Sequence, residues 1–216
     1  MSGAGKGQRG LRRLVIALAL SGCAIPGKAL RSGIDFGEDG PRVWVAGPWE
    51  AIVPATDVDD VVDQLCPAVM ALEHAREHDD GWEYCGLLYT GGGMTYASAP
   101  SPLSRDKPGP SGIKSCRIPA MVRDPQHDAQ VLSDYHSHPW PDSPLSANDA
   151  ALRSQRWSIR IQFDTRCHVY KLVPHVGEPV PGEVYERVGK TWRPTSIIRV
   201  EDKPAGLVQP PLSDGR

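Results

Sequence analysis

Two histidines separated by one residue are the first candidates for chemistry in this chain. His136 and His138 lie in a segment typical of a β-strand, where successive side chains point to opposite faces. Both imidazoles therefore point to the same face, where their nitrogens can bind one first-row metal ion. Ten residues separate His138 from Asp149, which can return to the histidines as a third ligand. Three protein ligands leave a fourth position for water, as in a catalytic metal site.

The residues around Asp149 predict the start of a helix. Ser146 and Asp149 have the spacing of a capping box, with Ser146 at the N-cap and Asp149 at N3. A helix N-terminus keeps a carboxylate ionised, which a metal ligand must be. Asp142 is a rival ligand, and Asp134 is either a rival or a residue that orients a ligand from the same strand face. Without a metal, these residues would form an ordinary helix cap beside solvated or core histidines.

The surrounding sequence predicts the elements that must position these side chains. Apolar residues recur every three to four positions over 57–78, which predicts a helix that Pro67 should kink or interrupt. The capping box predicts a second helix over 146–156. Strands are expected over 42–45, 82–90, 94–97, 113–118, 131–138, 158–163, 167–173, 184–188 and 191–193. This order, without an internal repeat, predicts an α+β fold in which a mixed β-sheet has one helix on each side.

Two motifs together resemble one known family. His136-Ser137-His138-Pro139, followed by Ser146-Ala147-Asn148-Asp149, is similar to the HxHP…SxxD signature of the JAMM (JAB/MPN) metallopeptidases. That family also has an upstream glutamate in an E-x-x-G-L-L segment, which Glu83-Tyr84-Cys85-Gly86-Leu87-Leu88 matches. The resemblance covers about residues 57–175, and all five motif positions are present in a divergent flanking sequence.

The resemblance implies a cytidine-deaminase-like JAB/MPN architecture and a Zn²⁺ ion held by His136, His138 and Asp149. It implies that Glu83 is the general base and proton shuttle, and that Ser146 helps to stabilise the oxyanion. Zinc-dependent hydrolysis of a peptide or isopeptide bond is therefore expected. The alternative is a non-catalytic MPN-like binding or scaffold protein, although such proteins usually lose a ligand or the glutamate. A metallo-β-lactamase-like HxHxDH site is excluded, because no histidine follows Asp142.

The N-terminal residues have the pattern of an export signal. Four basic and no acidic residues precede the apolar run 14–20, which is too short to span a hydrocarbon core of about 30 Å. Leu20-Ser21-Gly22-Cys23 resembles the bacterial lipoprotein box, in which the cysteine is acylated and becomes the new N-terminus. We therefore expect a signal peptide over 1–22 and a lipid anchor on Cys23. This predicts a location on the periplasmic face of the bacterial cell envelope, at the outer membrane. The alternative is an ordinary signal peptide followed by a chance cysteine.

Beyond the signal, we expect a flexible tether over 23–40, a metallopeptidase domain over 41–202 and a loose C-terminal tail over 203–216. Four further cysteines form an even number, which fits two disulfides in an oxidising compartment. Three pairings are possible, and buried free thiols are the alternative. The cysteines are Cys66, Cys85, Cys116 and Cys167.

The charge of the chain limits its partners. It has 24 Lys+Arg and 26 Asp+Glu, a formal net charge of −2, and loss of the four basic signal residues takes this to −6. Without a positive excess, nucleic acid is not an expected partner. The expected partners are a peptide, protein or peptidoglycan-type substrate, and the membrane through the lipid anchor.

Overall fold

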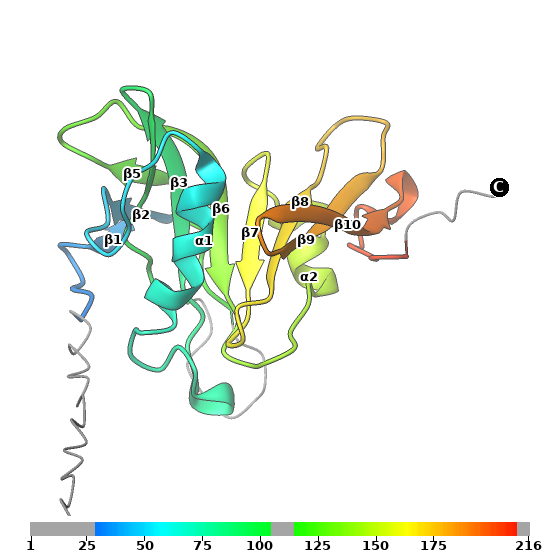
Figure 1. Cartoon of the computed structure of the whole chain (residues 1–216), viewed down its shortest axis with the longest axis horizontal. Helices are drawn as coiled ribbons and strands as arrows, with labels where there is room; N and C mark the ends of the chain where they lie inside the picture. Colours follow the sequence, from blue (N-terminus) through cyan, green and yellow to red (C-terminus); the bar gives the residue numbers. More distant parts are fainter. Residues whose placement is uncertain (1–28, 105–114, 211–216) are drawn as a thin grey trace, which may run out of the picture.

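The computed structural model describes residues 29–104 and 115–210. Within these ranges the fold is α+β, with two β-sheets and few helices, as Figure 1 shows. In the same ranges, no helix combines the length and the apolar character that crossing a bilayer requires. The predicted signal peptide over 1–22 and its acylated Cys23 lie outside the described residues.

Within the described residues, seven strands form the large sheet, in the order β10-β9-β8-β7-β6-β3-β4. β6 and β7 pair in parallel and the other neighbours are antiparallel, so the sheet is mixed, as predicted. The strands are β3 (Cys85–Gly91), β4 (Met94–Ala97), β6 (Gln130–Ser137), β7 (Arg160–Phe163), β8 (Val169–Val173), β9 (Gly182–Val188) and β10 (Thr191–Ile198).

Helix α1 (Val58–Val69) covers one face of this sheet (Figure 1). Asp57 caps its N-terminus by accepting a backbone N–H two residues ahead at 2.9 Å. The apolar stripe of the helix, with Leu65 fully buried, packs against Leu88 and Tyr135 in the main hydrophobic core. The predicted amphipathic helix is therefore present, and its apolar face is the one that the sheet covers.

The length predicted for this helix was wrong. α1 ends at Val69, and turns and a 3₁₀ helix (His78–Asp80) take the place of the predicted helical residues 70–78. Pro67 lies in the last turn, where it has no N–H to donate and its ring crowds the carbonyl of the preceding turn. Residues 73–80 are mostly charged or histidine, so there is no apolar face to bury beyond the proline.

A three-stranded sheet lies on the opposite face of the large sheet. Its order is β1-β2-β5, and Phe36 and Val45 pack against Leu87, whose side chain points away from α1. The sequence did not predict this sheet as a separate layer. Its strands are β1 (Phe36–Asp39), β2 (Arg42–Ala46) and β5 (Met121–Arg123).

Several predicted boundaries differ from the structure. The strand expected over 82–90 is Cys85–Gly91, the strand expected over 158–163 begins at Arg160, and the strand expected over 191–193 continues to Ile198. Residues 36–39, placed in the tether, form β1, and residues 115–118, placed in a strand, are irregular and precede β5. The disulfide at Cys116 and the following Pro119, which has no N–H, account for the missing strand. Residues 203–210 are also ordered, because Lys203 is buried and Gln209 pairs with the last residues of β10.

The second predicted helix is present but short. α2 (Ala147–Ala150) packs through Ala150 against apolar side chains of β8, β9 and β10, and a 3₁₀ helix (Leu152–Ser154) follows it. The backbone carbonyl of Asp149 accepts hydrogen bonds from the side chains of Gln155 and Arg160. This carbonyl therefore does not continue the helical ladder toward residue 156. α1 and α2 lie on opposite faces of the large sheet, as predicted.

The four cysteines form two disulfides. Cys66 in α1 is joined to Cys167 just before β8, and Cys85 in β3 is joined to Cys116 just before β5. This selects one of the three possible pairings and excludes buried free thiols at these positions. The first disulfide connects α1 to the large sheet, and the second connects β3 to the segment that leads into the small sheet.

We expect loss of the Cys66–Cys167 disulfide to destabilise the chain more than loss of Cys85–Cys116. The two bonds close segments separated by 101 and 31 residues. Loop-closure entropy in the unfolded chain then gives about 4.7 and about 3.7 kcal/mol. Urea unfolding of the Cys66→Ser/Cys167→Ser and Cys85→Ser/Cys116→Ser double variants measures both losses. A larger loss in the second variant would contradict the chain-entropy explanation.

Candidate metal centre

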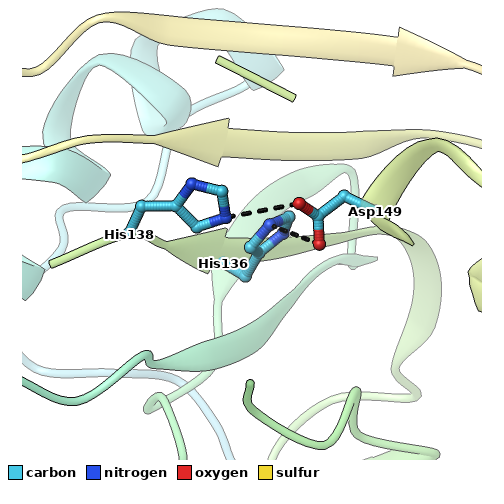
Figure 2. A group of neighbouring side chains, drawn as sticks. All are labelled: His136, His138 and Asp149. Carbon is cyan, nitrogen blue, oxygen red and sulfur yellow. Dashed lines mark ion pairs between the residues drawn. The ribbon is translucent and has the colours of Figure 1, made fainter. Parts of the chain in front are cut away.

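The two histidines lie at the C-terminal end of β6. His136 is 2% exposed and His138 is 5% exposed, and their ring centroids are 5.1 Å apart. Both face the side of the sheet that carries α2, as the alternation of a strand requires (Figure 2). Ser137 between them points to the other face, where its Oγ accepts the N–H of Tyr84 at 3.0 Å. The strand thus presents both imidazoles on one face of the sheet.

Asp149 completes a cluster of three side chains. Its Oδ1 lies 3.5 Å from His136 Nε2 and its Oδ2 lies 3.4 Å from His138 Nε2. Dashed lines mark these two ion pairs in Figure 2. The three ligand atoms lie within 4.8 Å of one another. The convergence of His136, His138 and Asp149, predicted from their spacing, is therefore confirmed, and together they could hold a metal ion.

The capping box orients the Asp149 carboxylate. Ser146 donates to Asp149 Oδ2 from its hydroxyl at 2.5 Å and from its backbone N–H at 3.2 Å. Ser146 Oγ in turn accepts the backbone N–H of Asp149 at 3.1 Å. The predicted capping box is therefore present, and it fixes the orientation of this carboxylate. Because a hydroxyl has one proton, Ser146 can donate to an oxyanion only after it releases Asp149.

The protonation states of the cluster suit metal binding. Burial lowers the pKa of His136 below its usual value, and the neighbouring Asp149 carboxylate opposes this effect only in part. Burial alone would raise the pKa of Asp149, but the neighbouring His136 and His138 hold it well below the usual value. A neutral imidazole and an ionised carboxylate are the forms in which these residues bind metals.

Glu83 faces the cluster from the segment just before β3. The antiparallel register that pairs Cys85 with His136 places Glu83 opposite His138. Its side chain is 8% exposed, and its Oε1 lies 3.9 Å from His138 Nε2. A water molecule bound beside the three ligands would therefore lie within reach of this carboxylate. Glu83 and the three ligands line one cleft of about 1180 Å³.

The hydrogen bonding of His136 provides a test of the fit to a metal. Neither of its ring nitrogens has a hydrogen-bond partner among the described residues, although both are buried. A buried polar atom without a partner is costly, and coordination of Nε2 would remove one such cost. Two imidazoles and one carboxylate are also a donor set that first-row divalent metals bind. The residues present therefore fit a metal ion.

Two residues that the sequence did not single out orient His138. Its Nδ1 lies 2.7 Å from Ser143 Oγ, and Gln162 Nε2 lies 3.2 Å from the same nitrogen. An amide nitrogen only donates, so Gln162 acts through Ser143 on a His138 that carries its proton on Nδ1. Because Nε2 faces Asp149, its lone pair is available to a metal only when Nδ1 carries the proton and donates it to Ser143. Gln162 also donates to the backbone carbonyl of Ser143 at 2.9 Å, which fixes the loop between the ligands.

Arg160 is a third residue that the sequence did not reveal. Its Nε donates to Asp134 Oδ2, its Nη1 to the Asp149 carbonyl and its Nη2 to the Ser154 carbonyl, each at 2.7 Å. Asp134 is fully buried and paired with Arg160, so it supports the position of Asp149 through this guanidinium. The sequence did contain one signal for this role, because Arg160 is a charged residue inside a strand that was expected to be buried.

Replacing Arg160 by leucine should destabilise the chain by about 3–5 kcal/mol, because the buried Asp134 carboxylate loses its partner. The Asp134→Leu/Arg160→Leu double variant should recover most of this loss. Both variants should bind metal about 10- to 100-fold more weakly, because the Asp149 carbonyl is no longer held. Urea unfolding of the metal-free chain and competitive metal titration measure the two effects. A double variant as unstable as the single one would contradict this role of the pair.

A second acidic cluster is explained by its protein partners. Asp142, Asp164 and His168 also lie close enough to hold an ion. Asp142 pairs with Arg166 at 2.7 Å, however, and Asp164 accepts four N–H donors, three of them from the backbone. Asp142, considered as a rival ligand, therefore lies in this other cluster and not with His136 and His138.

Comparisons of the chain with protein-family models, with curated proteins and with solved structures found no match.

Proposed function

We propose that this protein is a zinc-dependent metallopeptidase with a JAB/MPN-type domain, which hydrolyses a peptide or isopeptide bond. One observation carries the proposal. His136, His138, Asp149 and Glu83 come from three separate segments of the chain and face one cleft with the spacing that such a site requires. If Asp149 were only a helix cap and the histidines only core residues, there would be no reason for the Glu83 carboxylate to face them.

The distances between the three side chains are compatible with zinc. Ligands at about 2.0–2.1 Å from a tetrahedral zinc ion lie about 3.3 Å apart. The distances of 3.5 and 3.4 Å from the Asp149 oxygens to His136 Nε2 and His138 Nε2 are close to this value. Three protein ligands also leave the fourth position that distinguishes a catalytic zinc site from a structural one.

Zinc would polarise the scissile carbonyl and lower the pKa of a bound water to about 7. Glu83 accepts one proton from the attacking water, whose oxygen forms the new bond to the carbonyl carbon. Glu83 then passes this proton to the nitrogen of the leaving amine as the C–N bond breaks. Ser146 holds Asp149 and Ser143 holds His138, so these two proposed ligands stay in place during the transfer. Donation of an oxyanion hydrogen bond by Ser146 stays a prediction.

The arrangement of the elements supports the JAB/MPN assignment of the fold. A mixed sheet carries α1 on one face and the site with α2 on the other. The HxH segment lies at the end of the inner strand β6, beside the Glu83 segment and the parallel strand β7.

We place the enzyme in the bacterial cell envelope, held by acylation of Cys23 on the periplasmic face of the outer membrane. The export pattern of residues 1–23 supports this placement. The substrate would then be a peptide, a protein tail or a peptidoglycan-type cross-link, and the acidic chain makes nucleic acid an unsuitable partner. The two disulfides agree with an oxidising compartment.

The test is cleavage of a peptide library by the full chain after zinc loading, with products identified by mass spectrometry. Cleavage should stop after zinc is chelated, return after zinc is restored, and be absent from the Glu83→Gln variant. A chain with one bound zinc per molecule that cleaves neither peptides nor isopeptide-linked substrates would contradict the proposal.

A further inference from the structure

The charges around the cleft are unequally distributed. Of the charged side chains that line it among the described residues, the two acids are Glu83 and Asp149, which both face the metal cluster. All the others are arginines, although the chain as a whole has more acidic than basic residues. These arginines are Arg117, Arg153, Arg156 and Arg160.

Two of the four arginines are neutralised by carboxylates. Arg160 is buried against Asp134, and Arg117 pairs with Glu38 at the edge of the small sheet. Arg153, in contrast, is exposed and donates to a neutral partner, the side-chain oxygen of Asn148, at 3.0 Å. Arg156 is exposed and has no hydrogen bond or ion pair within the described parts of the chain.

The segment that carries these two cations is fixed beside a metal ligand. Arg153 and Arg156 follow α2, whose first turn contains Asp149. Gln155 between them donates to the carbonyls of Asp149 and Ala151, and Arg160 holds the carbonyl of Ser154. A wall that is already ordered loses little conformational entropy when a ligand binds, so its cations are well placed for recognition.

We propose that Arg153 and Arg156 form a carboxylate-binding wall of the cleft, which selects substrates with a carboxylate near the scissile amide. A guanidinium binds a carboxylate through two parallel hydrogen bonds, and a cleft lined by one sign of charge attracts ligands of the other sign. The carboxylate is either the C-terminal carboxylate of a peptide or the side chain of an acidic residue. As a statement about substrate, this inference rests on the function proposed above.

Binding of four dansyl-labelled peptides, Gly-Ala-Xaa-Ala-Gly, to the zinc-loaded full chain tests the wall. Xaa is Glu or Gln, and the C-terminus is a free acid or an amide. The chain carries Glu83→Gln so that the peptides stay intact, and ionic strength is low because salt screens exposed charges. The peptide with Xaa = Gln and an amidated C-terminus, called the Gln amide, has no carboxylate. At least one of the carboxylate-bearing peptides should bind about tenfold more tightly than this peptide. The peptide with this advantage identifies the C-terminus or the side chain as the source.

Variants of the arginines locate the effect. Arg153→Ala and Arg156→Ala should each reduce the advantage of the carboxylate, and Arg156→Glu should reverse it, while binding of the Gln amide stays unchanged. Arg193→Ala is the matched control, because Arg193 is exposed on β10 and does not line the cleft. Equal affinities for all four peptides, or an equal loss in the control, would overturn the wall.

The result also separates this inference from the proposed function. Carboxylate-dependent binding that requires Arg156, in a chain that hydrolyses nothing, would support the wall and overturn the hydrolase. Hydrolysis with the same kcat/KM for carboxylate and amide peptides, unaffected by Arg156→Ala, would support the hydrolase and overturn the wall.

Discussion

Replacing His136 by alanine is expected to remove bound zinc from the full chain almost completely. The substitution leaves one imidazole and one carboxylate, which is too few ligands for a stable zinc site. Loss of a residue that only supports a ligand weakens metal binding about 10- to 100-fold, and loss of the ligand itself should exceed this. Elemental analysis after extensive dialysis should find about one zinc per unmodified chain and little in the variant.

The control for this experiment is His168→Ala. His168 belongs to the second acidic cluster, and its side chain is 39% exposed beside Asp164. This variant should keep its zinc, because the ligands on β6 and α2 are intact. Zinc loss from His168→Ala with retention in His136→Ala would move the metal site to the second cluster. Thermal unfolding of both variants checks that zinc loss does not reflect an unfolded chain.

Replacing Glu83 by glutamine is expected to lower kcat by about 10²- to 10⁴-fold, the usual contribution of a general acid–base group. Glutamine has the same size but cannot accept the proton of the attacking water. Zinc content should not change, because Glu83 Oε1 lies 3.9 Å from His138 Nε2 and the proposed ligands His136, His138 and Asp149 stay in place. Steady-state kinetics on a cleaved peptide, with elemental analysis of the same samples, measures both quantities.

Glu201→Gln provides the matched control, because Glu201 is exposed on the 3₁₀ helix Val200–Asp202 that follows β10 and does not line the cleft. It should leave kcat and zinc content unchanged. The alternative function, a scaffold that binds a partner without cleaving it, predicts another result. The unmodified chain would then have no turnover, and Glu83→Gln would still bind the partner. Turnover that survives in Glu83→Gln would contradict the role of this carboxylate.

The local pattern of the sequence was sufficient to predict the elements of the site. Strand alternation placed His136 and His138 on one face, and the capping box predicted the helix start at Ser146. Both follow from interactions between residues close in sequence, which is why a single chain reveals them. The amphipathic helix α1 was predicted for the same reason, and an interruption at Pro67 was one of the two expected effects of this proline, but the helix does not continue to residue 78.

Long-range contacts decided the features that were missed. The three-stranded sheet requires pairing of β2 with β5, and no residue of β2 indicates that partner. The choice among three disulfide pairings depends on which cysteines the fold brings together. α2 ends early because Arg160 and Gln155 bind the carbonyl of Asp149. Periodicity in the sequence does not report such competition for a backbone group.

Local patterns were enough to predict the types and spacing of the candidate metal ligands and the α+β class of the fold, because alternation, capping and hydrophobic period act locally. The folded structure was needed to show that Glu83 lies opposite His138, that Arg160 joins Asp134 to the Asp149 carbonyl, and that Arg153 and Arg156 line the cleft. Each of these contacts joins segments that strand register and packing bring together, and register depends on the whole sheet.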